Sequence, residues 1–225
     1  METTLNFCGD SITFGLTHCT PEETYVAELA RLLAEANPDR RVVRIDGNRP
    51  SGVLRVQEYE KILVSNGTEG TLTLVRNGVG GETVERAYER IDQLSGILAN
   101  GREPSCTVLM YGINDASKKH PEKYVLPVVF KWQYRRLLRE LKRRNPQVRL
   151  ILMTPTVSEP SLGEYAQAVR ELAQEEGLLC VDLHGFWAEH ATEAWLNPPD
   201  ICHPTPVAAK AMAQYIFSII NKKGL

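Results

Sequence analysis

The sequence has no long apolar run and almost no charge imbalance. None of its hydrophobic stretches approaches the roughly 20 residues of a membrane-spanning helix, although 43% of the 225 residues are hydrophobic. The 26 Lys and Arg residues nearly balance the 28 Asp and Glu residues, for a net charge of −2, so nothing favours a nucleic-acid or membrane-surface partner. We therefore expect one soluble domain over residues 1–225, long enough to bury a sizeable core.

Cysteine is scarce and odd in number. The five cysteines show no CxxC spacing, and Cys106 and Cys180 lie beside apolar runs, where a reduced thiol packs like a small hydrophobe. The N-terminal residues METTLNFCGD also lack the basic region and the apolar stretch of a signal peptide. These features favour a cytoplasmic protein, or a secreted one if a signal peptide has been removed.

Short apolar runs alternate with helical patterns along the chain. The strand candidates are residues 3–8, 71–78, 106–112, 148–155 and 178–183. Between and after them, apolar residues recur at helical spacing, which predicts helices over residues 20–37, 84–94, 125–144, 165–173 and 204–220. Strands and helices in alternation predict an α/β fold with a parallel, doubly wound, five-stranded sheet.

The segment from Arg40 to Gly70 interrupts this alternation. It contains two or three strand-like runs separated by the turn-forming pairs Asp46-Gly47, Ser51-Gly52 and Asn66-Gly67. We expect an inserted β-hairpin or a small antiparallel extension here. Such an insertion could reshape access to a site or form an oligomer interface, so a homo-oligomer stays open.

Chemically capable residues follow the predicted strands. In a doubly wound sheet, functional groups gather beyond the carboxyl ends of the strands. There the sequence reads Gly9-Asp10-Ser11 after the first strand, RNGVGGET (residues 76–83) after the second and YGIND (residues 111–115) after the third. The segment PPDICHP (residues 198–204) stands just before the last helix.

These segments supply the parts of an acyl-transfer site. Ser11 could attack a carbonyl carbon if a base took its proton, and His203 is the candidate base. Asp200 lies three residues earlier in a proline-bounded turn, where its carboxylate could accept from Nδ1–H and leave Nε2 for the serine. The N–H groups of Ser11 and Gly81 and the side-chain amide of Asn114 could stabilise the oxyanion.

A second acid–base pair is available. Asp182 and His184 stand at the end of the fifth predicted strand, and residues two apart in a strand point the same way. We favour Asp200 and His203 because a bounded turn suits a triad. Taken alone, Ser11 would be interpreted as a cap or turn residue, so the hypothesis depends on all the segments together.

Phosphate and metal sites are less well supported. GVGGET lacks the Lys-Ser/Thr of a P-loop. Cys202 is disfavoured as a nucleophile, because adjacent residues in an extended turn point apart. A metal site is disfavoured too, because the residues that could form one lack zinc-like spacing: Cys8, His18, Cys202 and His203.

The order of the motifs resembles a known family. A GDS motif, a glycine turn after the second strand, GxND after the third and DxxH near the C-terminus run from Gly9 to His203. With these motifs the sequence resembles the SGNH (GDSL-type) hydrolases over nearly its whole length, whereas the GxSxG elbow of α/β-hydrolases is absent around Ser11. The resemblance implies a flavodoxin-like three-layer α/β/α sandwich that hydrolyses esters without a metal or cofactor.

The resemblance also implies roles for five residues: nucleophile Ser11, base His203, orienting acid Asp200, and oxyanion donors Gly81 and Asn114. The sequence departs from the family pattern in two places. Arg76 stands where an asparagine often opens the second motif, with Asn77 as the nearest substitute, and the insertion at residues 40–70 is longer than usual.

We expect a serine esterase that works through an acyl-enzyme. A short acyl group, such as an O-acetyl group on a carbohydrate, is favoured because no long apolar stripe marks an acyl channel. Four aromatic residues in or near segments that could border the site could stack on a sugar: Tyr124, Trp132, Trp187 and Trp195. Lysophospholipid or thioester hydrolysis, acyl transfer to an alcohol, and a carbohydrate- or protein-binding module without turnover are the alternatives.

Overall fold

Seven strands form one sheet in the computed structural model, which describes residues 2–48, 56, 58–96, 98–156 and 162–223. They are β1 (Thr3–Gly9), β2 (Arg41–Asn48), β3 (Glu58–Asn66), β4 (Thr71–Gly78), β5 (Cys106–Met110), β6 (Arg149–Met153) and β7 (Leu179–Val181). Their order is β3-β2-β4-β1-β5-β6-β7, and each neighbouring pair is parallel except β2 and β3. The predicted α/β fold with a mostly parallel sheet is confirmed.

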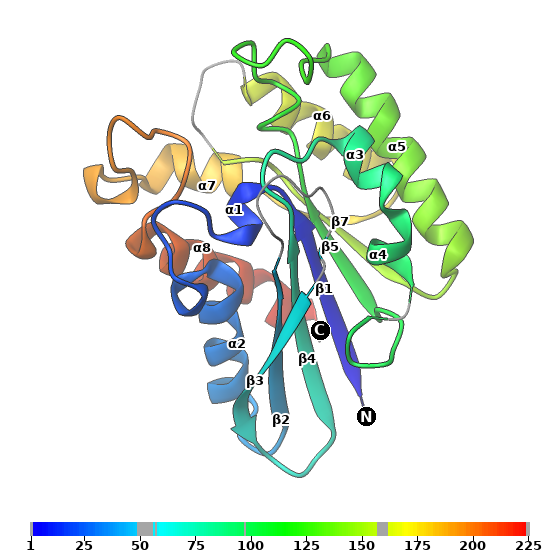
Figure 1. Ribbon diagram of the computed structural model, residues 1–225, viewed down its shortest axis with the longest axis vertical. Helices are drawn as coiled ribbons and strands as arrows, with labels where there is room; N and C mark the ends of the chain where they lie inside the picture. The colour runs from blue at the N-terminus through cyan, green and yellow to red at the C-terminus, as the bar shows by residue number, and fades with distance from the viewer. Residues whose placement is uncertain (1, 49–55, 57, 97, 157–161, 224–225) are drawn as a thin grey trace.

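Helices cover both faces of the sheet (Figure 1). They are α1 (Ser11–Phe14), α2 (Tyr25–Ala36), α3 (Val84–Glu89), α4 (Ile91–Ser95), α5 (Pro127–Arg144), α6 (Leu162–Glu175), α7 (Leu183–His190) and α8 (Pro206–Ile220), with 3-10 turns at Pro21–Glu23, Glu193–Trp195 and Asn221–Lys223. Buried apolar side chains of α1, α2, α7 and α8 pack on one face, and those of α3 to α6 on the other. The sheet therefore lies between two helical layers.

The Arg40–Gly70 segment adds two strands, so the expected count of five is wrong. β2 pairs in parallel with β4, and β3 pairs antiparallel with β2, so the predicted hairpin continues the main sheet. Val42 and Val43 are buried on opposite faces of β2, as in an interior strand, whereas β3 is largely solvated and forms the sheet edge.

The turn signals of this segment have different outcomes. The predicted break at Asp46-Gly47 is wrong, because both residues lie within β2. Gly47 permits close packing there, since a Cβ on it would lie 2.8 Å from Val56 Cγ1 and 2.9 Å from the Arg76 carbonyl oxygen. The predicted turn after Asn66 follows the last residue of β3, and Ser51-Gly52 lies outside the described residues.

Two helices differ from the sequence pattern. Thr20 precedes only the 3-10 turn, whereas Thr24 caps α2 by accepting a hydrogen bond from the N–H of Ala27 at 3.2 Å. The helix predicted from residue 84 is divided into α3 and α4 at Arg90, whose side chain enters the protein and pairs with Glu82. The short helices α1 and α7 have no predicted counterpart.

The three central strands determine where the loops lie. β1 pairs in parallel with β4 on one side and with β5 on the other, and Gly9 is aligned with both Gly78 and Met110. The carboxyl ends of these strands therefore meet at one edge. The segments that follow them, beginning at Asp10, Val79 and Tyr111, emerge side by side.

Two glycines let α1 sit directly on this edge. A Cβ on Gly78 would lie 2.4 Å from the backbone nitrogen of Phe14, and one on Gly9 would lie 2.3 Å from Thr13 Oγ1 of α1 and 2.8 Å from the Met110 carbonyl oxygen. Such distances cannot be accommodated without moving backbone. Arg76 of β4 also donates a hydrogen bond to the Phe14 carbonyl oxygen, so the end of β4 holds α1 in place.

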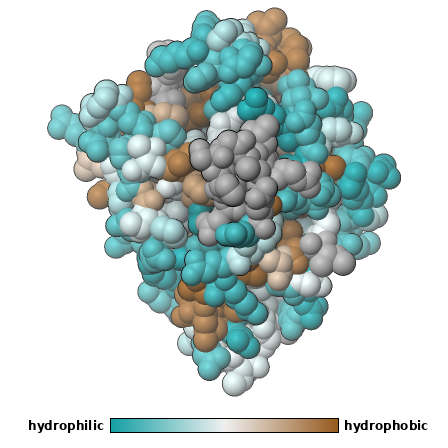
Figure 2. All heavy atoms as spheres, viewed as in Figure 1, coloured by the Kyte–Doolittle hydropathy of each residue, from teal (hydrophilic) through white to brown (hydrophobic). Residues whose placement is uncertain are grey.

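The side of the molecule seen in Figure 2 is mainly hydrophilic, with hydrophobic residues in smaller groups among the polar ones. Exposed apolar side chains of this kind are usual on globular proteins. None of the described helices combines the length and the apolar character that crossing a bilayer requires.

We predict that Gly78→Ala lowers the free energy of unfolding by about 1–3 kcal/mol, because the added methyl group meets the backbone of α1. Urea denaturation of the purified variant measures this. Gly163→Ala in α6 is the matched control, since its Cβ would have its nearest neighbour at 3.9 Å. This control should be neutral or stabilising by up to about 1 kcal/mol. Equal stability of both variants would contradict the close packing of α1.

Candidate active site

Ser11 is the first residue of α1, directly beyond β1. Asp10 caps this helix, and its Oδ1 accepts a hydrogen bond from the N–H of Ile12 at 2.9 Å. As the first helical residue, Ser11 has no intrahelical acceptor for its own N–H. The sharp strand-to-helix turn thus presents both the hydroxyl group and the N–H of Ser11 at the sheet edge.

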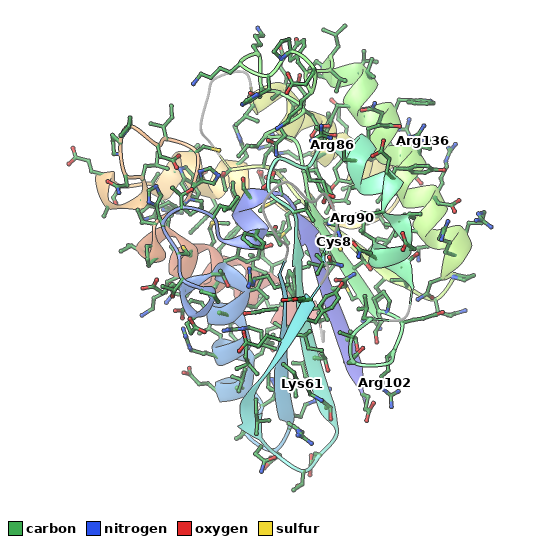
Figure 3. The ribbon with its side chains drawn as sticks, in the orientation of Figure 1. Cys8, Lys61, Arg86, Arg90, Arg102 and Arg136 are labelled. Carbon is green, nitrogen blue, oxygen red and sulfur yellow. The ribbon has the colours of Figure 1, made fainter. Side chains whose placement is uncertain are left out.

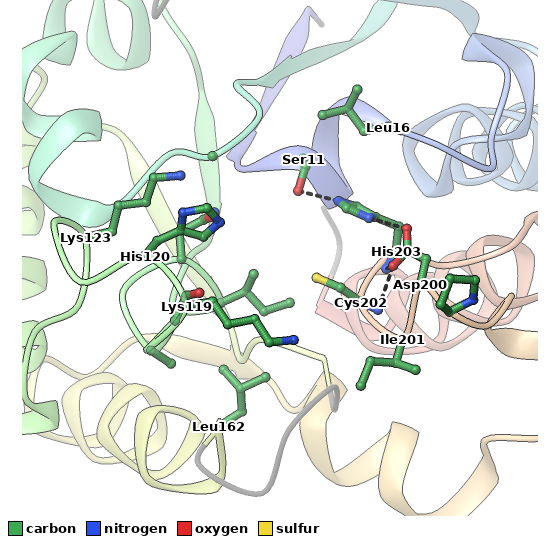
Figure 4. A pocket seen from close by; sticks show the side chains of 16 residues that line it. Ser11, Leu16, Lys119, His120, Lys123, Leu162, Asp200, Ile201, Cys202 and His203 are labelled. Carbon is green, nitrogen blue, oxygen red and sulfur yellow. Dashed lines mark hydrogen bonds and ion pairs between the residues drawn. The ribbon is translucent and has the colours of Figure 1, made fainter.

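His203 links Ser11 to Asp200. Its Nε2 lies 2.9 Å from Ser11 Oγ, and its Nδ1 lies 2.7 Å from Asp200 Oδ2 (Figure 4). The sequence separates Ser11 from His203 by 192 positions. This chain of contacts can move a proton from the serine hydroxyl to the imidazole while the carboxylate holds the opposite ring nitrogen.

The turn around Asp200 orients the imidazole. Asp200 Oδ1 accepts hydrogen bonds from the N–H groups of Cys202 and His203, at 2.9 and 3.1 Å, which leaves Oδ2 for the His203 ring. Burial raises the pKa of Asp200, but these backbone hydrogen bonds and the His203 ring outweigh it and lower the pKa to about 2. The carboxylate is therefore ionised at neutral pH.

His18 is a further neighbour of Asp200 that the sequence analysis did not assign to the site. Its Nε2 lies 3.3 Å from Asp200 Oδ2, the same oxygen that faces His203. His18 follows α1 in a loop, and no motif in the sequence singles it out. A protonated His18 would form an ion pair with Asp200.

Gly81 and Asn114 lie in the loops that flank Ser11. Gly81 has φ of +76°, a conformation that favours glycine. Asn114 Nδ2 donates to the Glu82 carbonyl oxygen at 3.0 Å, which fixes the amide and leaves its second hydrogen for another acceptor. Both residues line the same pocket as Ser11.

The buried ion pair of Glu82 and Arg90 supports the turn at Gly81 from the protein interior. Glu82 accepts from the Arg90 guanidinium at 2.7 Å and from the Tyr111 hydroxyl at 2.9 Å, and Arg90 also donates to the carbonyl oxygen of Asn77 at 2.9 Å. Figure 3 places Arg90 between the sheet and the α3–α4 segment. The sequence does not predict this pair, because isolated charged residues in a helical pattern are normally solvated.

The site opens into a pocket of about 400 Å³. Its larger apolar lining residues are Leu16, Ile113, Leu162 and Ile201, and Ser11 lines it as well. This volume lies at the lower end of the range for small-ligand sites.

The second-motif residues Arg76 and Asn77 point to opposite faces of β4. Arg76 pairs with Asp46 at 3.2 Å on the α1 side. On the other side, Asn77 donates to the Gln93 carbonyl oxygen at 2.8 Å and accepts from Arg90. Neither is among the described residues that line the pocket. The departure from the family pattern therefore lies in residues that hold neighbouring segments in place and not in the pocket lining.

The alternative acid–base pair, Asp182 and His184, makes its hydrogen bonds outside the pocket. Asp182 caps α7 through the N–H of Gly185 and accepts two hydrogen bonds from Arg170 at 2.9 and 3.0 Å. The backbone N–H of His184 donates to the Thr154 hydroxyl group. Asp182 and His184 are not among the described residues of the pocket, and their geometry is that of a helix cap.

The aromatic residues proposed for sugar stacking are not in the pocket wall. Trp187 and Trp195 are buried and pack against each other, with ring centres 5.0 Å apart. Trp132 is exposed on α5, beside Arg136. Tyr124 is half-buried and lies 6.0 Å from the Lys118 ammonium. None of the four is among the described residues lining the pocket.

The described residues contain no group of three or more His, Cys, Asp or Glu side chains arranged to hold a metal ion. Cys8 is fully buried in the core. Cys202 lines the pocket, and its backbone N–H donates to Asp200.

Two more carboxyl groups are buried beneath the site. Burial raises the pKa of Asp10 to about 7, against the lowering effect of the Ile12 N–H and the His203 charge. Burial likewise raises the pKa of Asp115 to about 7, although its Oδ1 accepts from the N–H of Val84 at 3.1 Å. These groups cap and connect the loops that carry the pocket residues.

The chain is similar to one known protein family in sequence and to several solved structures in fold. The sequence profile of the GDSL-like lipase/acylhydrolase family matches residues 55–211, and no curated protein matches the chain. Axe2, an acetylxylan esterase from Geobacillus stearothermophilus, is similar in structure with a TM-score of 0.68 and 23% identity, over 96% of this chain and 93% of that one.

Two further solved structures share the fold. A lipase/acylhydrolase from Enterococcus faecalis has a TM-score of 0.68 and 18% identity, over 98% of this chain and 96% of that one. LAE5, an alpha/beta hydrolase enzyme from the metagenome of Lake Arreo, has a TM-score of 0.66 and 24% identity, over 96% and 94%. At these identities the likeness establishes the fold.

We predict that Asp10→Asn removes part of the pH dependence of stability. An unfolded aspartate titrates near 3.8 and the folded one near 7, so the folded state binds the proton more tightly. Relative to the variant, the wild type should therefore lose stability as pH rises from about 4 to 7, by up to about 4 kcal/mol, and be constant outside this window. Chemical denaturation at a series of pH values measures the difference.

The exposed Asp39 provides the control for this measurement. Asp39→Asn changes the net charge equally and should leave the stability profile parallel to that of the wild type. Asparagine caps helices about as well as aspartate, so loss of the cap does not confound Asp10→Asn. Parallel profiles for Asp10→Asn and the wild type between pH 4 and 7 would refute the burial argument.

Proposed function

The chain belongs to the GDSL-like lipase/acylhydrolase family, a family of carboxylic ester hydrolases, and from this premise we propose that it is a serine esterase with Ser11, His203 and Asp200 as its catalytic triad. The observation that carries the proposal is the contact chain from Ser11 Oγ to His203 Nε2 and from Nδ1 to Asp200. We assign the whole of residues 1–225 to one domain of this kind.

In the first half-reaction, Ser11 Oγ attacks the ester carbonyl carbon and its proton passes to His203 Nε2. Negative charge develops on the carbonyl oxygen, within reach of the N–H groups of Ser11 and Gly81 and the amide of Asn114. When the tetrahedral intermediate collapses, the ester C–O bond breaks and the alcohol leaves with the proton from Nε2. An acyl group is then bound to Ser11.

In the second half-reaction, water replaces the alcohol. His203 Nε2 takes a proton from water, the hydroxide attacks the acyl carbon, and collapse releases the carboxylic acid while Ser11 Oγ recovers its proton. Asp200 remains ionised throughout, because its pKa of about 2 lies far below neutrality. No step needs a metal or a cofactor.

We assign the acyl group as short, with an O-acetyl ester of a carbohydrate as the first substrate to test. The pocket of about 400 Å³ mixes aliphatic residues with lysine, histidine and serine side chains, which suits a small acyl group better than a long chain. The choice of a carbohydrate ester is supported by the fold shared with the acetylxylan esterase Axe2. Buried Trp187 and Trp195 contribute no stacking surface to this assignment.

A substrate panel distinguishes the alternatives. Acetyl, butyryl and octanoyl p-nitrophenyl esters report acyl length, while acetylated xylo-oligosaccharide, a lysophospholipid and an acyl thioester report the leaving group. Preference for octanoyl or lysophospholipid substrates would assign lipid hydrolysis. New esters formed with added sugar alcohols would assign acyl transfer.

We predict that Ser11→Ala lowers kcat for p-nitrophenyl acetate by at least about a thousandfold, because the variant has no hydroxyl group to form the acyl-enzyme. Stopped-flow and steady-state assays of the purified proteins measure this. Ser218→Ala, which changes an exposed serine in α8, is the control and should retain wild-type turnover. Equal background rates for the wild type and Ser11→Ala would leave only a binding module.

We further predict that Asn114→Ala lowers kcat by about 10²–10³ with little change in KM, since its amide acts on charge that develops in the transition state. Asn100→Ala is the matched control, because Asn100 lies at the opposite end of the sheet and donates to Thr4. A change confined to KM would show that Asn114 binds the ground state instead.

A further inference from the structure

One wall of the pocket is cationic. Lys119, His120 and Lys123 lie in the loop between β5 and α5, across the pocket from His203 and Asp200 (Figure 4). Asp200 is the one acidic residue among the described residues that line the pocket. Two lysine side chains therefore lie on the wall that faces the proposed nucleophile.

The carboxylate of Asp200 is already engaged. It accepts hydrogen bonds from the ring of His203 and from the N–H groups of His203 and Cys202, and it lies 3.3 Å from His18. Of the loop residues, His120 lies 3.6 Å from Glu122. No ion pair joins Lys123 to an acid within the described part of the chain, so its charge is available to a ligand.

The Lys123 ammonium lies close to the proposed oxyanion site. A Cβ built on Gly81 would come within 3.0 Å of Lys123 Nζ. Figure 4 shows this side chain extending from its loop toward the space in front of Ser11. Lys123 is half-buried, in contrast to its exposed neighbours Lys118 and Lys119, so its interaction with a bound anion is less screened by water.

Backbone hydrogen bonds hold the loop that carries Lys123. Its N–H donates to the His120 carbonyl oxygen at 2.9 Å, and the N–H of Val125 donates to the Asp115 carbonyl oxygen at 3.0 Å. The Val125 carbonyl oxygen in turn accepts from the Tyr165 hydroxyl group of α6 at 2.5 Å. The base of the side chain is therefore positioned before any substrate binds.

We propose that Lys123 binds an anionic group of the substrate, so that the enzyme prefers esters carrying a negatively charged group next to the scissile bond. This inference rests on the proposed esterase function and specifies its substrate class. The anion could belong to the acyl part, as in a half-ester of a dicarboxylic acid, or to the alcohol part, as in an acetylated acidic sugar. Both sources offer the same chemistry to the ammonium group.

Matched ester pairs test the proposal in the full-length enzyme. For the acyl side, 4-nitrophenyl hemisuccinate is compared with its neutral methyl ester, 4-nitrophenyl methyl succinate. For the alcohol side, 4-acetoxybenzoate is compared with methyl 4-acetoxybenzoate. The measured quantity is the ratio of kcat/KM for the anionic ester to that for the neutral ester, in the wild type, Lys123→Met and Lys118→Met.

We expect Lys123→Met to lower this ratio by about tenfold or more in one of the two arms, as for loss of a hydrogen bond to a charged group. The arm that responds identifies the part of the substrate that carries the anion. Lys118→Met should leave both ratios unchanged, because Lys118 makes the same change in net charge but faces Tyr124 outside the pocket. Added salt should lower the wild-type ratio and have less effect on Lys123→Met.

Two results would overturn the proposal. If Lys123→Met slows the neutral and anionic esters equally, Lys123 acts on the oxyanion or on folding and does not select substrates. If Lys123→Met leaves the kcat/KM of every ester unchanged, Lys123 binds no substrate anion. Failure of the esterase assignment is distinguishable, because the wild type would then hydrolyse every ester no faster than Ser11→Ala.

Discussion

The parallel pairing of β1 with β4 and β5 is the constraint on which the site depends. Because Gly9 is in register with Gly78 and with Met110, the loops that carry Ser11, Gly81 and Asn114 leave the sheet at the same height. His203 arrives by another route, on the segment before α8, whose buried residues share a core with α2 and with β1. The position of the imidazole therefore depends on helix packing across one face of the sheet.

Charged residues buried on both faces of β4 support this arrangement. On one face, Arg76 pairs with Asp46 and donates to the carbonyl oxygen at the end of α1. On the other face, Arg90 pairs with Glu82 below the Gly81 turn. Burying such charges is costly, so ion pairs of this kind contribute less to net stability than to the placement of the groups they touch. Here one pair contacts the end of α1 and the other lies next to the turn at Gly81.

Much of the fold was predictable because the central strands are apolar on both faces and the helices are amphipathic. The strand count was not, since β2 resembles an insertion by its Asp46-Gly47 pair and is recognised as an interior strand only when its register with β4 is known. The division of the predicted helix at Arg90 was also hidden. A charged residue between apolar ones is normally solvated. The inward orientation of Arg90 depends on its ion pair with Glu82, which lies in the turn before α3.

The sequence by itself determined the alternation of strands and helices, the family and the residue types available at each strand end, because hydrophobic periodicity and short motifs are local properties of the chain. Only the tertiary structure decided that Ser11, His203 and Asp200 are in contact, that Asp182 serves as a helix cap, and that Trp187 and Trp195 are buried. It also placed the ammonium of Lys123 above Gly81. Such contacts join segments distant along the chain, and their geometry follows from packing that no local pattern encodes.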